Sequence, residues 1–180
     1  MSDVLERLAV LLREEGGLMA TLVHPVAGPD RPAGLAVASP ARLAADGPRA
    51  EGRRAEYELL VEAIYEGYLL HYETPRAVRV PDADLRLLAG DRLYAIGLAQ
   101  LVALGDTAAV AELADTITLS ALAQGAGEPE LADAVWAAGA RAIGWGSSEA
   151  HRRAKELVLA GSPKAIEAMS TSARGLLAPR

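Results

Sequence analysis

The chain has 180 residues, a formal net charge of −6 and no cysteine. Its residues are 51% hydrophobic but only 4% aromatic, with no Phe, so the core must consist of Ala, Leu and Val, which favours close helix packing over a β-sandwich. The acidic balance argues against a broad nucleic-acid surface, and the missing cysteines exclude disulfides, thiolate zinc sites and cysteine nucleophiles. The start lacks the order of a signal peptide, and no apolar run of about 18 residues occurs, so we expect a cytoplasmic protein with no transmembrane segment.

Apolar residues recur at helical spacing along most of the chain, and no stretch alternates in the manner of a strand. Capping residues, glycines and prolines divide these stretches into separate helices. The predicted helices span residues 2–15, 55–72, 84–104, 107–124, 130–143, 147/148–160 and 163–177, with a short apolar stretch at 18–23 that can resume the first helix. We therefore expect an all-α protein, a compact bundle of about seven helices that forms a single domain over residues 1–180.

One segment, from about residue 24 to residue 54, does not fit a helix. It holds five prolines and several glycines, and it shows no sustained apolar period. Loops of this length in a compact domain are usually functional, draped over a partner, or disordered. We expect a Pro/Gly-rich loop here.

The segment from Leu93 to Leu104 has a single polar side chain, that of Gln100, and is otherwise apolar on all sides. A helix that is apolar all round is usually buried. This segment is therefore predicted to be the central helix of the bundle.

The helix over residues 55–72 carries four of the five tyrosines of the chain, beside a broad apolar face. Together with one valine, the tyrosines advance by three or four residues and so form a stripe along the helix. The members of this tyrosine stripe are Tyr57, Val61, Tyr65, Tyr68 and Tyr72. Two interpretations stay open. The tyrosines edge the core with their hydroxyls in water, or they form an interface with a second chain, where Tyr is enriched.

Three glutamates of the same helix, Glu58, Glu62 and Glu66, recur every four residues. A carboxylate-bridged metal site would need a Glu-x-x-His partner, which is missing, so we interpret this row as a solvated face. The side chains of His71 and Glu73 diverge unless the helix frays at its end. No G-x-S-x-G motif and no glycine-rich phosphate loop occur, and we therefore assign neither catalytic residues nor metal ligands.

The string LLAGDRL, residues 87–93, stands in the first half of the helix over 84–104. It resembles the helix of trans-polyprenyl diphosphate synthases that reads roughly "LAGDYL". The resemblance continues through the apolar helix, a Leu-Gly-Asp turn at 104–106 and the string LADTI at 113–117, and it covers about residues 55–125. It implies an isoprenoid-synthase-like helical fold.

The synthases of this family bind Mg²⁺ and an allylic diphosphate through two Asp-Asp-x-x-Asp motifs, whereas this chain has no adjacent Asp pair. The position of the first motif is held by HYETP, residues 71–75, and the chain has about half the usual length. It is therefore most similar to the small, non-catalytic subunits of heteromeric hexaprenyl and heptaprenyl diphosphate synthases. The resemblance implies a subunit without activity or cofactor of its own. The catalytic subunit would hold the Mg²⁺, and the small subunit would help to set the length of a product such as the menaquinone side chain.

The resemblance also implies roles for several residues. The small residues Gly67, Gly90 and Gly97 mark places where a prenyl chain or another helix can approach closely. Asp91 is expected to be at least partly buried, with its charge compensated by Arg92 or a helix terminus, because a buried carboxylate without a partner costs several kcal/mol. The tyrosine stripe would contact the catalytic subunit.

Two other functions stay open. One is a helical interaction or scaffold protein, a homodimer that uses the same tyrosine stripe and has no connection with isoprenoids. The other is an enzyme or ligand carrier whose apolar helices enclose a pocket. The expected partner is therefore either a catalytic prenyl diphosphate synthase subunit or a second copy of the chain.

Overall fold

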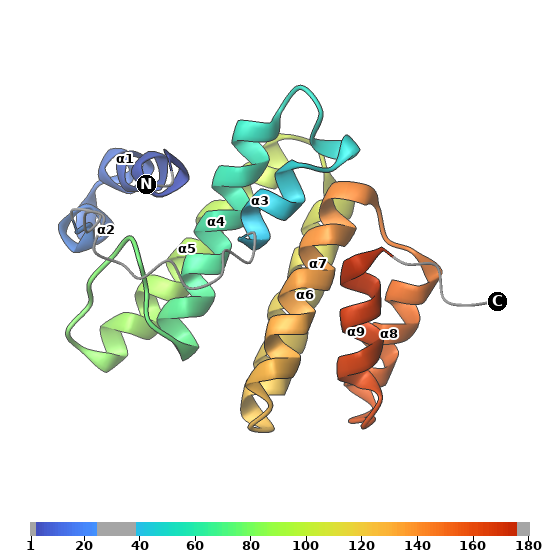
Figure 1. The fold of residues 1–180 in the computed structure, drawn as a ribbon. Helices are drawn as coiled ribbons and strands as arrows, with labels where there is room; N and C mark the ends of the chain where they lie inside the picture. Colours follow the sequence, from blue (N-terminus) through green and yellow to red (C-terminus); the bar gives the residue numbers. More distant parts are fainter. Residues whose placement is uncertain (1–2, 25–38, 176–180) are drawn as a thin grey trace.

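The computed structural model describes residues 3–24 and 39–175, which fold almost entirely into α-helices (Figure 1). The expected all-α class is confirmed. The helices are α1 (Asp3–Glu15), α2 (Gly17–Leu22), α3 (Pro40–Ala45), α4 (Arg54–Tyr72), α5 (Ala83–Ala103), α6 (Thr107–Gly125), α7 (Pro129–Trp145), α8 (Glu149–Leu159) and α9 (Ala165–Arg174), with a 3₁₀ turn, η1, at Pro48–Ala50. Within the described residues, the one strand-like pairing is an isolated bridge between Val23 and Val78.

The long helices begin where their capping residues stand. The side chains of Asp82, Asp106 and Ser148 accept hydrogen bonds from backbone amides in the first turns of α5, α6 and α8. Gly146 ends α7 with a φ of 91°, a conformation that residues with a side chain rarely adopt. Because such signals are local in sequence, the predicted helix bounds agree with the observed ones within a few residues.

The segment predicted as one loop, residues 24–54, is partly helical, and that prediction is corrected. Both α3 and η1 lie within it, while residues 25–38 lie outside the described part of the chain. Ser39 caps α3 through its side chain. Gly47 then lies so close to the backbone of Gly144 in α7 that a Cβ atom at Gly47 would clash. This backbone contact and the buried side chains of Ala41, Ala44 and Ala50 hold the segment against the bundle.

The central helix is α4, and the prediction that placed the helix over Leu93–Leu104 at the centre is wrong. Figure 1 shows α4 between α1 and α2 on one side and α7 on the other. The larger apolar cluster joins α4 to α3, α6, α7, α8 and α9, and a smaller one joins α4 and α5 to α1 and α2. By contrast, one side of α5 faces solvent, where Val102 is 59% exposed. The outer side carries leucine, valine and alanine. The sequence of α5 from Leu93 onwards is therefore apolar on all sides, although this side of the helix is exposed.

Three glycines allow α4 and α5 to pack closely against each other. A Cβ atom at Gly67 would lie 2.9 Å from the carbonyl oxygen of Gly90, and one at Gly97 would lie 3.0 Å from that of Leu60. At Gly90 itself, a Cβ atom would lie 2.5 Å from Nε2 of His71. These glycines therefore serve helix packing, one of the two roles expected of them, because only a missing side chain lets the two backbones come so near.

Candidate functional site

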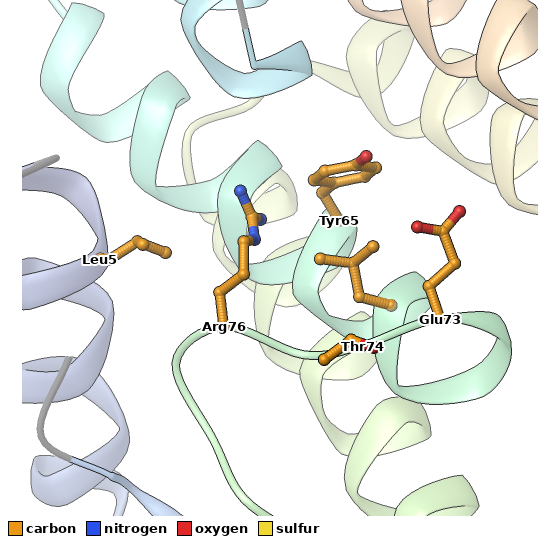
Figure 2. Close-up of a pocket in the computed structure, with 6 residues that line it drawn as sticks. Leu5, Tyr65, Glu73, Thr74 and Arg76 are labelled. Atoms are coloured by element: carbon orange, nitrogen blue, oxygen red, sulfur yellow. The ribbon is translucent and has the colours of Figure 1, made fainter. Parts of the chain in front are cut away.

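An open pocket of about 690 Å³ lies beside the C-terminal end of α4, next to α1 (Figure 2). Two of its residues belong to HYETP, residues 71–75, where the sequence resemblance places the first aspartate motif. The pocket is lined by Leu5, Tyr65, Leu69, Glu73, Thr74 and Arg76. Its wall is thus apolar and aromatic along α1 and α4, and polar along the connection from α4 to α5.

The glutamate row of α4 is not solvated, and that interpretation is wrong. The side chains of Glu62 and Glu66 are 1% and 0% exposed, and Glu58 is half-buried. Arg76 enters this row from the α4–α5 connection: its Nη2 donates to Oε1 of Glu62 at 2.5 Å, and its Nε donates to Oε2 of Glu66 at 3.3 Å. The backbone amides of Arg76 and Ala77 both donate to Oε1 of Glu66, at 2.5 and 2.6 Å. The row therefore anchors the connection to α4.

This buried cluster sets two carboxylates, Glu62 and Glu66, against one guanidinium. Burial raises the pKa of Glu62, the Arg76 charge opposes that shift, and the neighbouring Glu66 adds to it. Arg76 also lies over the ring of Tyr65, with its guanidinium carbon 5.0 Å from the ring centre. Burial raises the pKa of Tyr65 to about 12, so the phenol at the pocket wall keeps its proton at neutral pH.

The tyrosine stripe faces the chain's own core over most of its length. Tyr57, Val61 and Tyr68 are buried, so they are not available to a second chain, and the interface prediction is corrected for these three. Tyr65 and Tyr68 pack on the indole of Trp136 in α7, with ring centres 4.9 and 5.3 Å away. The sequence favours neither side of α4 because apolar clusters cover both.

The hydroxyls of the two buried tyrosines bond to protein groups, so the expectation that they point into water is also wrong for them. Tyr57 donates to Oδ2 of Asp106, the N-cap of α6, at 2.5 Å. Tyr68 accepts from Nε2 of Gln124 at 2.6 Å and donates to Oε1 of Glu73 at 3.3 Å. Burial and the bond to Asp106 raise the pKa of Tyr57 to about 12.

The two remaining tyrosines of the stripe are less buried. Tyr65 is half-buried and Tyr72 is 43% exposed. A contact between these two residues and a second chain stays a prediction.

Asp91 is exposed, contrary to expectation. Its side chain is 70% exposed, and its Oδ1 lies 3.2 Å from Nε2 of His71, whose ring stacks on Tyr94. Arg92 does not compensate it but pairs with Glu15 of α1 at 2.7 Å. A carboxylate in water needs no buried partner, since it keeps its hydration. The exposure of Asp91 therefore lends the family resemblance no support.

The pocket beside α4 offers a ligand one carboxylate, that of Glu73. Within residues 3–24 and 39–175, no group of three or more His, Cys, Asp or Glu side chains is placed to hold a metal ion. Hard cations such as Mg²⁺ need several converging oxygens. Three of the six lining residues are polar or charged, so the pocket offers hydrogen-bonding groups at Glu73 and Thr74 beside the apolar and aromatic side chains of α1 and α4.

A second candidate surface is the outer side of α5. Leu88 is 63% exposed and Val102 is 59% exposed, and Leu122 of the adjoining α6 is also exposed. Exposed apolar residues recur at helical spacing along this side, which we call the α5 outer face: Leu87, Leu88, Ala95, Ala99 and Val102. The exposed charged side chains of Asp91 and Arg92 stand between Leu88 and Ala95 on the same side. An apolar stripe that the described part of the chain leaves uncovered is typical of a surface that binds another protein.

Sequence analysis did not single out Arg76, the residue that organises the buried cluster. One signal was present. Carboxylates at i and i+4 on a helix that is apolar on its remaining sides, as Glu62 and Glu66 are, have no solvent to face. Such carboxylates require a cation, and Arg76 follows within one connection of the same helix.

No helix among the described residues is both long and apolar enough to cross a membrane. The resemblance to the polyprenyl diphosphate synthases is a prediction from the sequence of residues 55–125. Comparison of the chain with protein-family models, with curated proteins and with solved structures gives no match.

Proposed function

We propose that this chain is a non-catalytic subunit of a heteromeric trans-polyprenyl diphosphate synthase and acts with an aspartate-bearing catalytic subunit. One observation carries the proposal. The helix that holds LLAGDRL, residues 87–93, packs inward on α4 through glycines and presents an apolar stripe outward. The segment that resembles the family is thus also the segment that leaves a surface for a partner.

The inner side of α5 is covered by the same chain, whereas its outer side is exposed. Its inner side, at Gly90 and Gly97, is filled by α4 of the same chain, and a Cβ atom at either position would clash there. A prenyl chain or a second subunit therefore has no access to these glycines. The α5 outer face is the surface on which the catalytic subunit would bind, with Leu88 and Val102 as the large apolar contacts.

The pocket beside α4 supports a role without catalysis. The family places a Mg²⁺-binding aspartate motif at this position, whereas here the pocket has the carboxylate of Glu73 next to a phenol and a guanidinium that is already paired. In the proposed complex, the catalytic subunit holds Mg²⁺ and both diphosphates. This chain contributes apolar surface that limits or extends the space for the growing product.

The experiment that tests this proposal is co-expression with the aspartate-motif synthase subunit from the same genome. We expect affinity purification on a tag of that subunit to recover this chain, and size-exclusion chromatography with light scattering to give a defined heteromer. Recovery of this chain as a homodimer that does not bind the catalytic subunit would contradict the proposal and favour an interaction or scaffold protein instead.

A further inference from the structure

A second cluster, remote from α4, brings together a serine, a histidine and a glutamate from three helices. Oγ of Ser172, in the last turns of α9, lies 2.9 Å from Nδ1 of His151 in the first turn of α8. The other ring nitrogen, Nε2, lies 3.2 Å from Oε2 of Glu112 in α6. His151 is buried, while Ser172 and Glu112 are half-buried. These contacts have the serine–histidine–carboxylate order of a hydrolytic triad, with the two ring nitrogens exchanged relative to the Ser-His-Asp template.

The environment of Glu112 determines which nitrogen of His151 is the base. Burial would raise the pKa of Glu112, but hydrogen bonding to His151 and the neighbouring Lys155 ammonium outweigh it and lower that pKa to about 2. An ionised carboxylate only accepts hydrogen bonds, so Nε2 of His151 carries the proton that faces it. In the neutral imidazole, Nδ1 then has a lone pair directed at the hydroxyl of Ser172, which is the arrangement that activates a serine.

The triad opens into a pocket of about 310 Å³ that both Ser172 and His151 line. Glu149 and Ala150, in the first turn of α8, line it as well, and the first amides of a helix have no carbonyl partner within the helix. Arg141 stands at the same pocket, with its guanidinium carbon 4.5 Å from the ring centre of Trp145. Backbone amides and a cation beside the serine can stabilise the negative charge that develops on an attacked carbonyl oxygen.

We propose that Ser172, His151 and Glu112 form a site that hydrolyses esters of short acyl chains. Oγ of Ser172 attacks the carbonyl carbon while its proton moves to Nδ1 of His151, which gives a tetrahedral oxyanion. Collapse of this oxyanion breaks the bond to the alcohol oxygen, and the alcohol leaves with the proton from Nδ1. Water, deprotonated by Nδ1, then attacks the acyl-serine, the bond to Oγ breaks, and Nδ1 returns the proton to Oγ, which releases a carboxylic acid and the free serine. Ester and water thus give acid and alcohol.

The pocket also defines the substrate class. Its volume admits an acyl group of a few carbons, and the Trp145 indole and the Ala142 methyl supply an apolar wall. This activity goes beyond the proposed subunit role and does not depend on it, because the triad lies on α6, α8 and α9 rather than on the α5 outer face.

The test uses the purified full chain with two probes, p-nitrophenyl acetate and a fluorophosphonate that labels activated serines. We expect hydrolysis by the parent chain to be at least about a hundredfold faster than by the Ser172→Ala variant, which lacks the attacking hydroxyl. Peptide mass spectrometry should place the fluorophosphonate on Ser172. Ser170→Ala, two residues earlier on α9 and also half-buried, is the matched control and should keep full activity. Glu112→Gln should lower kcat with little change in KM, because Glu112 positions the base.

Equal hydrolysis by the parent chain and Ser172→Ala, or labelling at another residue, would overturn the proposal and leave the cluster as a structural contact among three helices. Ser172→Ala keeps the test decisive, since it removes only a hydroxyl from a half-buried position, whereas replacing the buried His151 can unfold the chain. Thermal unfolding of each variant by circular dichroism confirms that the compared proteins are folded.

Discussion

Glu66 and Arg76 are joined both through the backbone and through the side chain. Oε1 of Glu66 accepts the backbone amide of Arg76 at 2.5 Å, and its Oε2 accepts the guanidinium Nε at 3.3 Å. Since the glutamate is completely buried in α4, this carboxylate fixes the direction in which the chain leaves the helix. Glu66 thus fixes the part of the connection from α4 to α5 at Arg76 and Ala77, while Arg86 holds the carbonyl of Glu73 at 2.6 Å.

Replacing Glu66 should therefore destabilise the fold more than replacing its neighbour. Glu66→Gln sets an amide NH₂ group against backbone and guanidinium donors, and we expect a loss of about 3 kcal/mol. Glu62→Gln should cost less, because burial already raises the pKa of Glu62 and disfavours its charge. Urea unfolding of the two variants measures the difference. An equal loss in both would contradict the assigned role of Glu66.

Gly→Ala substitutions should have opposite effects on stability at two positions, one inside the α4–α5 contact and one outside it. A Cβ atom at Gly97 would meet the side chain of Ile64 and lie 3.0 Å from the carbonyl oxygen of Leu60, so Gly97→Ala should cost about 2 kcal/mol. Gly125, in the last turn of α6, has nothing within 4 Å of such an atom. Gly125→Ala should therefore stabilise by up to about 1 kcal/mol through helix propensity. Melting temperatures that fall alike in both variants would rule out this packing argument.

The Glu112 cluster predicts a loss of stability in acid. The pKa of Glu112 is about 2 in the folded chain against an ordinary value of 4.5, so the fold favours the ionised carboxylate. Its contribution is fully present above pH 4.5 and is lost as the pH falls from there towards 2. Glu112→Gln should be less stable than the parent at pH 7, and the gap should narrow on acidification. Thermal unfolding at a series of pH values checks this, and a gap independent of pH would refute it.

The α5 outer face predicts which substitutions weaken the heteromer. Leu88→Asp and Val102→Asp place charges on the exposed apolar stripe, and each should cost about 2 kcal/mol of binding, roughly thirtyfold in Kd. Leu159→Asp on α8 is the matched control, since its side chain is 64% exposed but lies on another helix. Titration of the catalytic subunit by isothermal calorimetry measures the three affinities. Similar losses for all three variants would show that the α5 outer face is not the binding surface.

The sequence predicts the helices well because their limits are local. Asp82 and Asp106 cap the helices that follow them, and Gly146 ends α7 where the apolar spacing breaks. The segment around α3 escaped prediction for the opposite reason. It is held by a backbone contact between Gly47 and Gly144, which are far apart in the chain, and by a few buried alanines on a helix of six residues, too short for a sustained apolar period.

The candidate site was harder to predict because a helical wheel shows the sides of a helix but not what covers them. On a helical wheel, Tyr68 fits an interface with a second chain and Glu66 fits a solvated face. In the structure, α7 packs on Tyr68, and the backbone after α4 donates a hydrogen bond to Glu66. Truncating Tyr68 would therefore test the core rather than an interface. Conversely, the segment from Leu93 to Leu104 is apolar on all sides, which predicts burial, yet its Val102 is exposed. Only the tertiary arrangement distinguishes these cases.

The central claim is tested most directly by prenyl transfer with isopentenyl diphosphate, an allylic diphosphate and Mg²⁺. The assay compares the catalytic subunit alone, this chain alone and the two together, with product length measured by chromatography. We predict no turnover by this chain alone. When it is added to the catalytic subunit, the product length should shift, and the shift should saturate at the stoichiometry of the heteromer. Turnover by the pure chain, or an identical distribution with and without it, would contradict the account.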